Sequence, residues 1–164
     1  MFGFKKKSST TELLAPANGE VVDLSDTKDP VFSRGALGIG FGLEPATGEI
    51  YAPMTGKVTL VAETKHAIGF ETTDGLQVLL HLGIDTVEMK GAPFELNVTV
   101  GQMVQAHDKL GTMDLQQVTA AGYLTTFLTV ITNSGELDLN LDLTTGQTQA
   151  GQAVAKIHRA EQSG

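Results

Sequence analysis

The clearest pattern of apolar and polar positions lies between residues 64 and 85, where two apolar runs flank a polar turn cluster. Period-two alternation over such short runs is typical of β-strands, and Asp74-Gly75 is typical of a hairpin turn. The stretch therefore predicts two antiparallel strands joined around Thr72 to Gly75. Each strand carries one histidine, His66 on the first and His81 on the second.

The register of this hairpin decides whether the two imidazoles meet. A loop at residues 72–75 sets His66 directly opposite His81, and a two-residue turn at Asp74-Gly75 makes the histidines diagonal neighbours on one face. Directly opposed Cβ atoms lie about 5 Å apart and diagonal ones about 7 Å, so both even registers bring the rings within reach. An odd register, from a three-residue loop or a bulge, would send the rings to opposite faces. We expect an even register.

Two sequence repeats indicate duplicated β units. The motif Ala-Pro-x-x-Gly-x-Val occurs at residues 15–21 and again at 52–58, and it predicts a corner between strands that the fold uses twice. Residues 101–114 and 146–157 each combine a Gly-Gln turn, a second turn and a strand. A second duplicated corner is therefore expected.

The remaining elements also favour strands. Between Leu37 and Leu43, apolar residues alternate with glycines, which predicts a strand with one buried face and one face closely approached by a neighbour. Residues 114–123 could form one or two helical turns, and residues 124–132 resume a strand rich in threonine, valine and isoleucine. The chain is therefore expected to be all-β, with short helical turns.

Length and composition fit one domain with a single core, since 41% of the 164 residues are hydrophobic. We expect this domain over residues 12–158, between a flexible tail at 1–11 and a short C-terminal tail at 159–164. The sequence has no cysteine, which excludes disulfides and Cys-ligated zinc and favours the cytoplasm. No apolar run approaches the ~18 residues of a membrane span, so no stable membrane insertion is expected.

The charge of −8, with only 11 lysines and arginines, argues against nucleic acid or an anionic membrane as a partner. An acidic surface suits a basic protein partner instead. The basic segment Met1 to Lys7 is interpreted as a solvated tail rather than a membrane-surface anchor. His107, in a turn, and His158, near the C-terminus, are interpreted as solvated surface residues.

Two imidazoles on one face permit three kinds of chemistry. Zinc hydrolysis needs a third ligand, and general acid–base catalysis needs a nearby nucleophile or substrate pocket. Covalent phosphate carriage needs one ring nitrogen to attack while its neighbour donates a hydrogen bond to the phosphate. This last chemistry needs the fewest additional groups, because Thr64 could hydrogen-bond His66 and Asp85 follows His81. Two half-buried structural histidines are the alternative that the spacing leaves open.

The run His81-Leu82-Gly83-Ile84-Asp85-Thr86-Val87, with Thr-x-His at residues 64–66, closely resembles the glucose-type enzyme IIA (EIIA) components of the bacterial sugar phosphotransferase system. The resemblance extends over about residues 13–158 and includes Asp29-Pro30-Val31-Phe32 and both Ala-Pro turns. It implies an antiparallel β-sandwich or flattened barrel with a shallow active-site depression. It also implies a monomeric cytoplasmic phosphotransferase that forms a phosphohistidine and needs no cofactor.

The resemblance also implies roles for individual residues. His81 would be phosphorylated through Nε2, His66 would stabilise the phosphoryl group, and Thr64 would hold His66. Asp29 and Asp85 match positions that face arginines of the donor, the phosphocarrier protein HPr. The phosphoryl group would pass on to the IIB domain of a sugar permease, and regulated transporters or metabolic enzymes are further implied partners. The apolar docking ring would consist of Val31, Phe32 and Ile68.

Ala62 departs from the family pattern, because some members carry phenylalanine there, and this change would make the docking surface less aromatic. A zinc-dependent peptidase of a related β fold is an alternative function, but its third ligand is missing from the sequence pattern. A regulatory protein-binding module is a second alternative function. Phosphoryl transfer requires no metal, although His66 and His81 could share one in a partner complex. Without a membrane or IIB segment, the transporter is expected to be a separate or detached chain.

Overall fold

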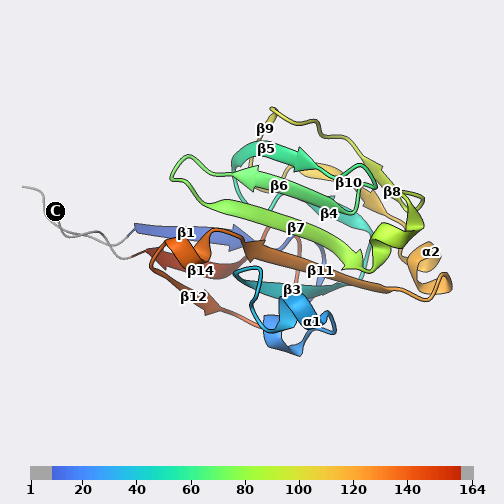
Figure 1. Cartoon of the computed structure of the whole chain (residues 1–164), viewed down its shortest axis with the longest axis horizontal. Coiled ribbons are helices and arrows are strands. Elements are labelled where there is room, and N and C mark those ends of the chain that lie inside the picture. Colours follow the sequence, from blue (N-terminus) through green and yellow to red (C-terminus); the bar gives the residue numbers. More distant parts are fainter. Residues whose placement is uncertain (1–8, 160–164) are drawn as a thin grey trace, which may run out of the picture.

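A computed structural model describes residues 9–159, and most of its regular elements are strands (Figure 1). The first seven are β1 (Ser9–Leu14), β2 (Gly19–Asp23), β3 (Ile39–Pro45), β4 (Glu49–Tyr51), β5 (Gly56–Val61), β6 (Ala67–Glu71) and β7 (Gln77–Ile84). The others are β8 (Phe94–Leu96), β9 (Met103–Val104), β10 (Lys109–Met113), β11 (Leu124–Ile131), β12 (Leu139–Leu143), β13 (Gly146–Thr148) and β14 (Ala153–Arg159). The helical segments are η1 (Leu24–Asp26), α1 (Pro30–Ser33), η2 (Thr86–Met89), α2 (Leu115–Ala120) and η3 (Ser134–Glu136).

The strands form three antiparallel sheets. The largest has eight strands in the order β13-β2-β3-β11-β7-β6-β5-β9, and two smaller sheets have the orders β1-β14-β12 and β4-β10-β8. Within the described residues the large sheet ends at β13 and β9 and does not close on itself. The predicted all-β antiparallel class is confirmed, as an open layered arrangement rather than a closed barrel.

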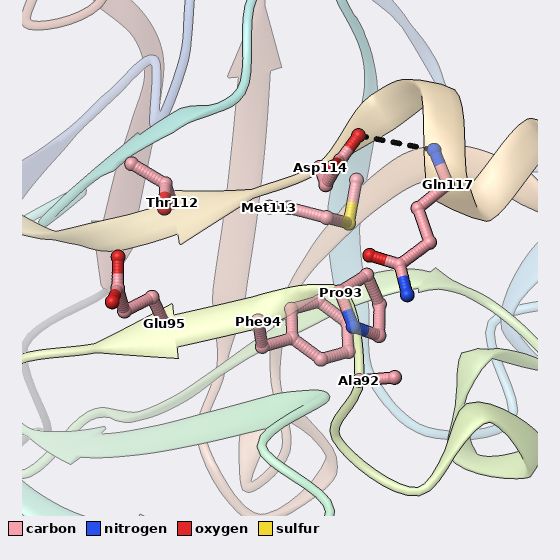
Figure 2. A pocket seen from close by; sticks show the side chains of 8 residues that line it. All are labelled: Ala92, Pro93, Phe94, Glu95, Thr112, Met113, Asp114 and Gln117. Carbon is pink, nitrogen blue, oxygen red and sulfur yellow. Dashed lines mark hydrogen bonds between the residues drawn. The ribbon is translucent and has the colours of Figure 1, made fainter.

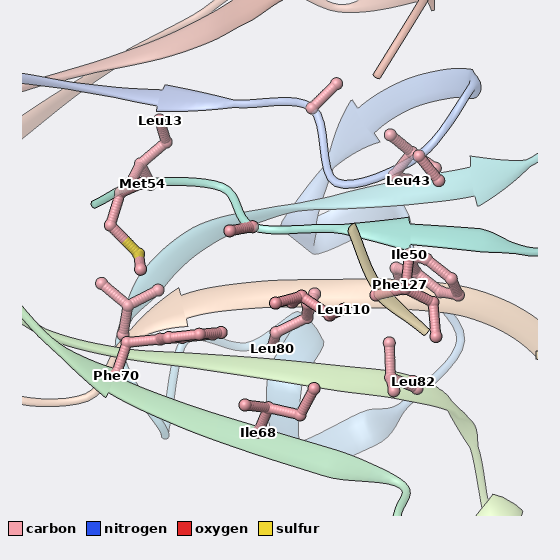
Figure 3. Packing of buried hydrophobic residues seen from close by; sticks show 14 of the residues in the cluster. Leu13, Leu43, Ile50, Met54, Ile68, Phe70, Leu80, Leu82, Leu110 and Phe127 are labelled. Carbon is pink, nitrogen blue, oxygen red and sulfur yellow. The ribbon is translucent and has the colours of Figure 1, made fainter. Parts of the chain in front are cut away.

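The main hydrophobic core lies against one face of the large sheet (Figure 3). Strand β7 alternates, so Val78, Leu80 and Leu82 enter this core while Leu79 and His81 point to the other face. Burying each such aliphatic side chain contributes about 1.5–3 kcal/mol. Other side chains of the core are Leu13, Leu43, Ile50, Met54, Ile68, Phe70, Leu110 and Phe127.

A small second cluster covers part of the opposite face. Phe32 of α1 packs there with Ile84, Leu128 and Val130, and Leu79 borders the cluster. The helix α1 thus lies on the same face of the sheet as His81, next to β3 and β11 (Figure 1). This placement leaves His81 between α1 on one side and the start of the neighbouring strand β6 on the other.

The duplicated corners are confirmed and pack against each other symmetrically. The backbone N–H of Leu14 donates to the carbonyl of Pro53 at 2.8 Å, and the equivalent N–H of Tyr51 donates to Pro16 at 2.8 Å. The second repeat behaves in the same way, since the N–H groups of Gly151 and His107 donate to Ala15 and Ala52 respectively. Each Ala-Pro corner is thus held by one copy of the later repeat.

The glycine-rich strand prediction is confirmed for β3. A Cβ atom at Gly40 would lie 1.9 Å from the carbonyl oxygen of Thr129, and one at Gly42 would lie 2.5 Å from Cγ2 of Thr27. Glycine is therefore required where these neighbours approach the strand. Leu37 lies before β3 and is 39% exposed, so the alternation holds only from Ile39 onward.

The ends of the domain lie beyond the predicted limits. β1 begins at Ser9 and pairs with β14, which reaches Arg159, so residues 9–11 and 159 are strand rather than tail. The basic segment Met1 to Lys7 lies outside the described residues. Among residues 9–159, no helix has the length and apolar character needed to cross a membrane.

Candidate active site

The rings of His66 and His81 lie side by side on the outer face of the large sheet. Their centroids are 5.1 Å apart and their planes meet at 78°. His81 is on β7, between Leu80 and Leu82, and His66 immediately precedes β6. The expected juxtaposition of the two imidazoles is therefore present.

The predicted even register, however, is wrong. Ala67 pairs with His81 and Glu71 with Gln77, so the loop spans residues 72–76 and the register is odd. In a continuous ladder this register would place the two rings on opposite faces. They meet because the chain bends before β6, where Lys65 has a φ of 63°.

Because of this bend, only one of the two backbone hydrogen bonds expected between His66 and Leu82 is present. The N–H of Leu82 donates to the carbonyl oxygen of His66 at 2.7 Å. In the described part of the chain, the N–H of His66 makes no return bond to Leu82. The carbonyl of Leu82 accepts from the hydroxyl of Thr86 instead, at 2.6 Å. His66 is thereby free to turn its ring toward His81.

The tautomer of His81 follows from one hydrogen bond. Nδ1 lies 2.8 Å from the carbonyl oxygen of Gly83, and a carbonyl can only accept, so Nδ1 carries the proton. The lone pair of the neutral ring is then on Nε2. Phe32 packs against the ring at a centroid distance of 5.1 Å, which further restricts its orientation. Nε2 is therefore the nitrogen of this imidazole that has a free lone pair.

His66 is held by Thr64, as predicted. The hydroxyl oxygen of Thr64 lies 2.5 Å from Nδ1 of His66. When this hydroxyl donates, Nδ1 accepts and the proton of the neutral ring lies on Nε2. His66 can then donate from Nε2 to an anionic group beside His81.

Both imidazoles are biased toward the neutral form. Burial lowers the pKa of His81 below 6.5, and the charge of His66 lowers it further. The Gly83 carbonyl and the carboxylates of Asp29 and Asp85 act in the opposite direction. Burial also lowers the pKa of His66. A neutral His81 keeps the lone pair that nucleophilic attack requires.

Asp29 and Asp85 lie close enough to influence His81, but they have different structural roles. Asp29 caps α1, its Oδ1 accepting from the N–H groups of Val31 at 2.9 Å and Phe32 at 3.1 Å. The cap holds Phe32 where it packs on His81. Asp85 is exposed and has a φ of 66° at the start of η2. Its carboxylate is therefore available to a cationic partner.

The predicted apolar docking ring needs correction. Val31 is 39% exposed and can contact a partner, whereas Phe32 is only 5% exposed and chiefly supports His81. Ile68 is fully buried, because it lies with Phe70 on the inner face of β6, and so it cannot belong to the ring. Val87, the last residue of the histidine motif, is 43% exposed in η2, although it was not predicted to belong to the ring.

Other chemistry finds little support around these rings. Within residues 9–159, no group of three or more histidine, cysteine, aspartate or glutamate side chains could hold a metal ion. His107 packs on Tyr51, with centroids 5.1 Å apart, and Nε2 of His158 lies 2.9 Å from the carboxylate of Asp142. Neither supplies a third ligand for a zinc peptidase.

A hollow of about 460 Å³ lies between β8, β10 and the start of α2 (Figure 2). Asp114 forms its upper edge in this view and caps α2, its Oδ1 accepting from the N–H of Gln117 at 3.0 Å. None of the predicted site residues lines this hollow. The other lining residues are Ala92, Pro93, Phe94, Glu95, Thr112 and Met113.

The fold and the site define an antiparallel β protein with two neutral histidines, one nucleophilic and one able to donate, as a covalent phosphate carrier would need. Residues 11–137 match the family model described as phosphoenolpyruvate-dependent sugar phosphotransferase system, EIIA 1. The chain belongs to this family, and it is a phosphotransferase component that carries phosphate within the sugar phosphotransferase system.

Individual relatives agree with this assignment. The chain is 34% identical to the glucose-specific EIIA component of Bacillus anthracis, over 95% of this chain and 98% of that protein. The solved structure of glucose permease IIA from Mycoplasma capricolum matches with a TM-score of 0.84 and 36% identity, covering 95% and 99% of the two chains.

Some relatives are much longer proteins. The chain is 44% identical over 151 residues to the glucose-specific EIICBA component of Streptococcus pneumoniae, covering 92% of this chain but 21% of that protein. The β-glucoside-specific EIIBCA component of Bacillus subtilis is 39% identical, and the match covers 24% of its length. The chain thus spans between a fifth and a quarter of these multidomain relatives.

Proposed function

We propose that His81 accepts a phosphoryl group from phospho-HPr on Nε2 and passes it to the IIB domain of a sugar permease in the cytoplasm. The hydrogen bond from Nδ1 of His81 to the Gly83 carbonyl carries this proposal. It directs the lone pair to Nε2 and removes the competing nitrogen. The ring lies half-buried on the outer face of the sheet, a position that suits attack on a group delivered by another protein.

The transfer balances without a cofactor. The lone pair of Nε2 forms a bond to phosphorus while the bond from phosphorus to the donor breaks, and the donor retains that electron pair. Positive charge develops in the His81 ring as the bond forms. The Gly83 carbonyl, 2.8 Å from Nδ1, and the nearby Asp29 and Asp85 carboxylates stabilise this charge. Transfer to the IIB domain reverses these steps.

His66 acts as the donor to the phosphoryl oxygens. Its ring centroid lies 5.1 Å from that of His81. Thr64 forms a hydrogen bond with Nδ1 of His66, so Nε2 is left to donate to the phosphoryl group. A donor aimed at the equatorial oxygens stabilises negative charge in the transition state. His66 thus aids transfer without forming a covalent bond.

The surface around His81 supports docking of a basic donor. Asp85 is exposed beside the site, and the chain has a net charge of −8, which favours association with a cationic surface. Val31 and Val87 add exposed apolar area. The multidomain relatives are named as glucose- and β-glucoside-specific, so the IIB partner rather than this domain is proposed to determine the sugar. The carrier acts as a monomer.

The test is incubation with phosphoenolpyruvate, enzyme I and HPr, followed by mass spectrometry that maps the modified residue. The expected result is one acid-labile phosphate on His81, and none on His81→Ala. His66→Ala should still accept phosphate but transfer it slowly to IIB. His158→Ala, whose ring contacts Asp142, serves as the control and should behave as wild type. Normal phosphate incorporation into His81→Ala would overturn the proposal.

A further inference from the structure

Thr86 has a side chain that the chemistry above does not use, although it is fully buried beside the site. Its exposed fraction is 0%, and its hydroxyl donates to the carbonyl of Leu82 at 2.6 Å. Leu82 directly follows His81, and its N–H donates to the carbonyl of His66. One residue therefore connects the backbones at both histidines, and Thr86 holds it.

The bond from Thr86 replaces a missing rung of the ladder. In the observed register, the residue opposite Leu82 is His66, whose N–H would normally donate to the Leu82 carbonyl. The bend at Lys65 removes that donor. A buried carbonyl without a partner is costly, by about 1–3 kcal/mol, so the Thr86 hydroxyl satisfies a group that the bend would leave unpaired.

The methyl group of Thr86 also constrains Gly83, the residue that follows Leu82. Gly83 has a φ of 87°, and a Cβ atom there would lie 2.4 Å from Cγ2 of Thr86. Thr86 therefore packs directly against Gly83, whose carbonyl accepts the proton of Nδ1 of His81. Its hydroxyl thus holds the Leu82 carbonyl and its methyl packs on Gly83, the residue whose carbonyl faces His81.

We propose that Thr86 is a positioning residue for the phosphoryl acceptor: by binding the Leu82 carbonyl and packing on Gly83 it holds the Gly83 backbone so that the Gly83 carbonyl stays on Nδ1 of His81. The imidazole is thereby kept in the tautomer with the free lone pair on Nε2. Without the hydroxyl, the backbone at Gly83 can shift, its carbonyl can leave Nδ1 and the ring exchanges between tautomers. This inference rests on the proposed role of His81 and adds a residue that does not touch the phosphoryl group.

The test compares Thr86→Val, which keeps the shape and loses the hydroxyl, with Thr86→Ser, which keeps the hydroxyl. We expect Thr86→Val to accept phosphate from phospho-HPr about tenfold more slowly, by analogy with the lower end of the loss that follows removal of the hydrogen-bond partners that orient metal-bound histidines. The nitrogen NMR shifts of its His81 should move from the Nδ1–H form toward a mixture of tautomers. Thr86→Ser should restore the tautomer and most of the rate.

Thr72→Val is the matched control for lost stability. Thr72 is also buried, on the same hairpin, and its hydroxyl accepts from the N–H of Leu76 and donates to Asp74 at the far end from the histidines. It should lose stability and keep the wild-type tautomer of His81. A wild-type tautomer and rate in Thr86→Val would overturn this inference, whereas wild-type protein that takes up no phosphate on His81 would overturn the proposed function itself.

Discussion

The hydroxyl oxygen of Thr64 lies 2.5 Å from Nδ1 of His66 and decides which nitrogen of that ring can face a phosphoryl group. We expect Thr64→Val to slow transfer from His81 to the IIB domain by about tenfold, because His66 loses its fixed orientation. Thr64→Ser keeps the hydroxyl and should transfer at close to the wild-type rate. Rapid-quench measurement of phosphate on both proteins checks this, and equal rates for Thr64→Val and wild type would contradict it.

Gly83 is expected to tolerate no side chain. Its φ of 87° disfavours other residues by about 1–2 kcal/mol, and a Cβ would also collide with Thr86. Gly83→Ala should therefore lower the free energy of unfolding by about 3 kcal/mol, with the overpacking term included. Gly75→Ala is the matched control, since Gly75 has a φ of 90° with nothing within 4 Å of a Cβ, and should cost only about 1 kcal/mol. Urea denaturation measures both, and similar losses would show that the contact with Thr86 is unimportant.

Phosphate acceptance should depend on pH through His81. Since burial lowers its pKa, the ring stays neutral down to a pH below 6.5 and then loses its lone pair to a proton. The acceptance rate should fall there as the pH decreases. The free energy of unfolding should also fall as the pH decreases below about 6.5, because the unfolded chain binds protons at His81 more readily than the folded chain. NMR titration of the His81 ring measures the midpoint, and a midpoint above 6.5 would refute this prediction.

Asp85→Asn should lower the pKa of His81 further, and with it the midpoint of the NMR titration. The Asp85 carboxylate raises the pKa of His81, and asparagine accepts the left-handed backbone at this position while lacking the charge. The variant should therefore remain able to accept phosphate at neutral pH, but bind HPr with a weaker dependence on salt. Titration and binding at two ionic strengths check both effects; an upward shift of the midpoint would contradict the first.

Thr129 offers a test of the core rather than of the site. Its side chain is fully buried, and its hydroxyl has no hydrogen-bond partner among the described residues. Thr129→Val should therefore stabilise the fold by about 1 kcal/mol, since an unsatisfied buried hydroxyl is costly. Thr126→Val is the contrasting variant, because that hydroxyl lies 2.9 Å from both carboxylate oxygens of Glu44 and its loss should destabilise. Thermal unfolding distinguishes the two.

The pattern of the sequence was sufficient for the hairpin, the duplicated corners and the glycine-rich strand, since these depend on side-chain period and turn chemistry. It was not sufficient for the register. An Asp-Gly pair suggested a short turn, but the loop spans residues 72–76. The rings still meet because Lys65 adopts a left-handed backbone conformation. This conformation is uncommon for residues other than glycine, so the sequence gives no sign of it at a lysine.

The errors around the site have a similar physical origin. Ile68 was placed on the docking surface by the family resemblance, yet Ile68 and Phe70 both point from β6 into the core. The bend at His66 breaks the strand alternation, so Ile68 does not share the outer face with the histidine. Thr64 lies beside His66 as its place in the sequence suggested, while the cap that Asp29 provides for α1 emerged only from its hydrogen bonds.

Strand β7 sends Val78, Leu80 and Leu82 toward the core and Leu79 and His81 toward the outside. The inward side chains therefore anchor the same backbone that carries His81, so a substitution that disturbs the core on this strand would also displace the imidazole.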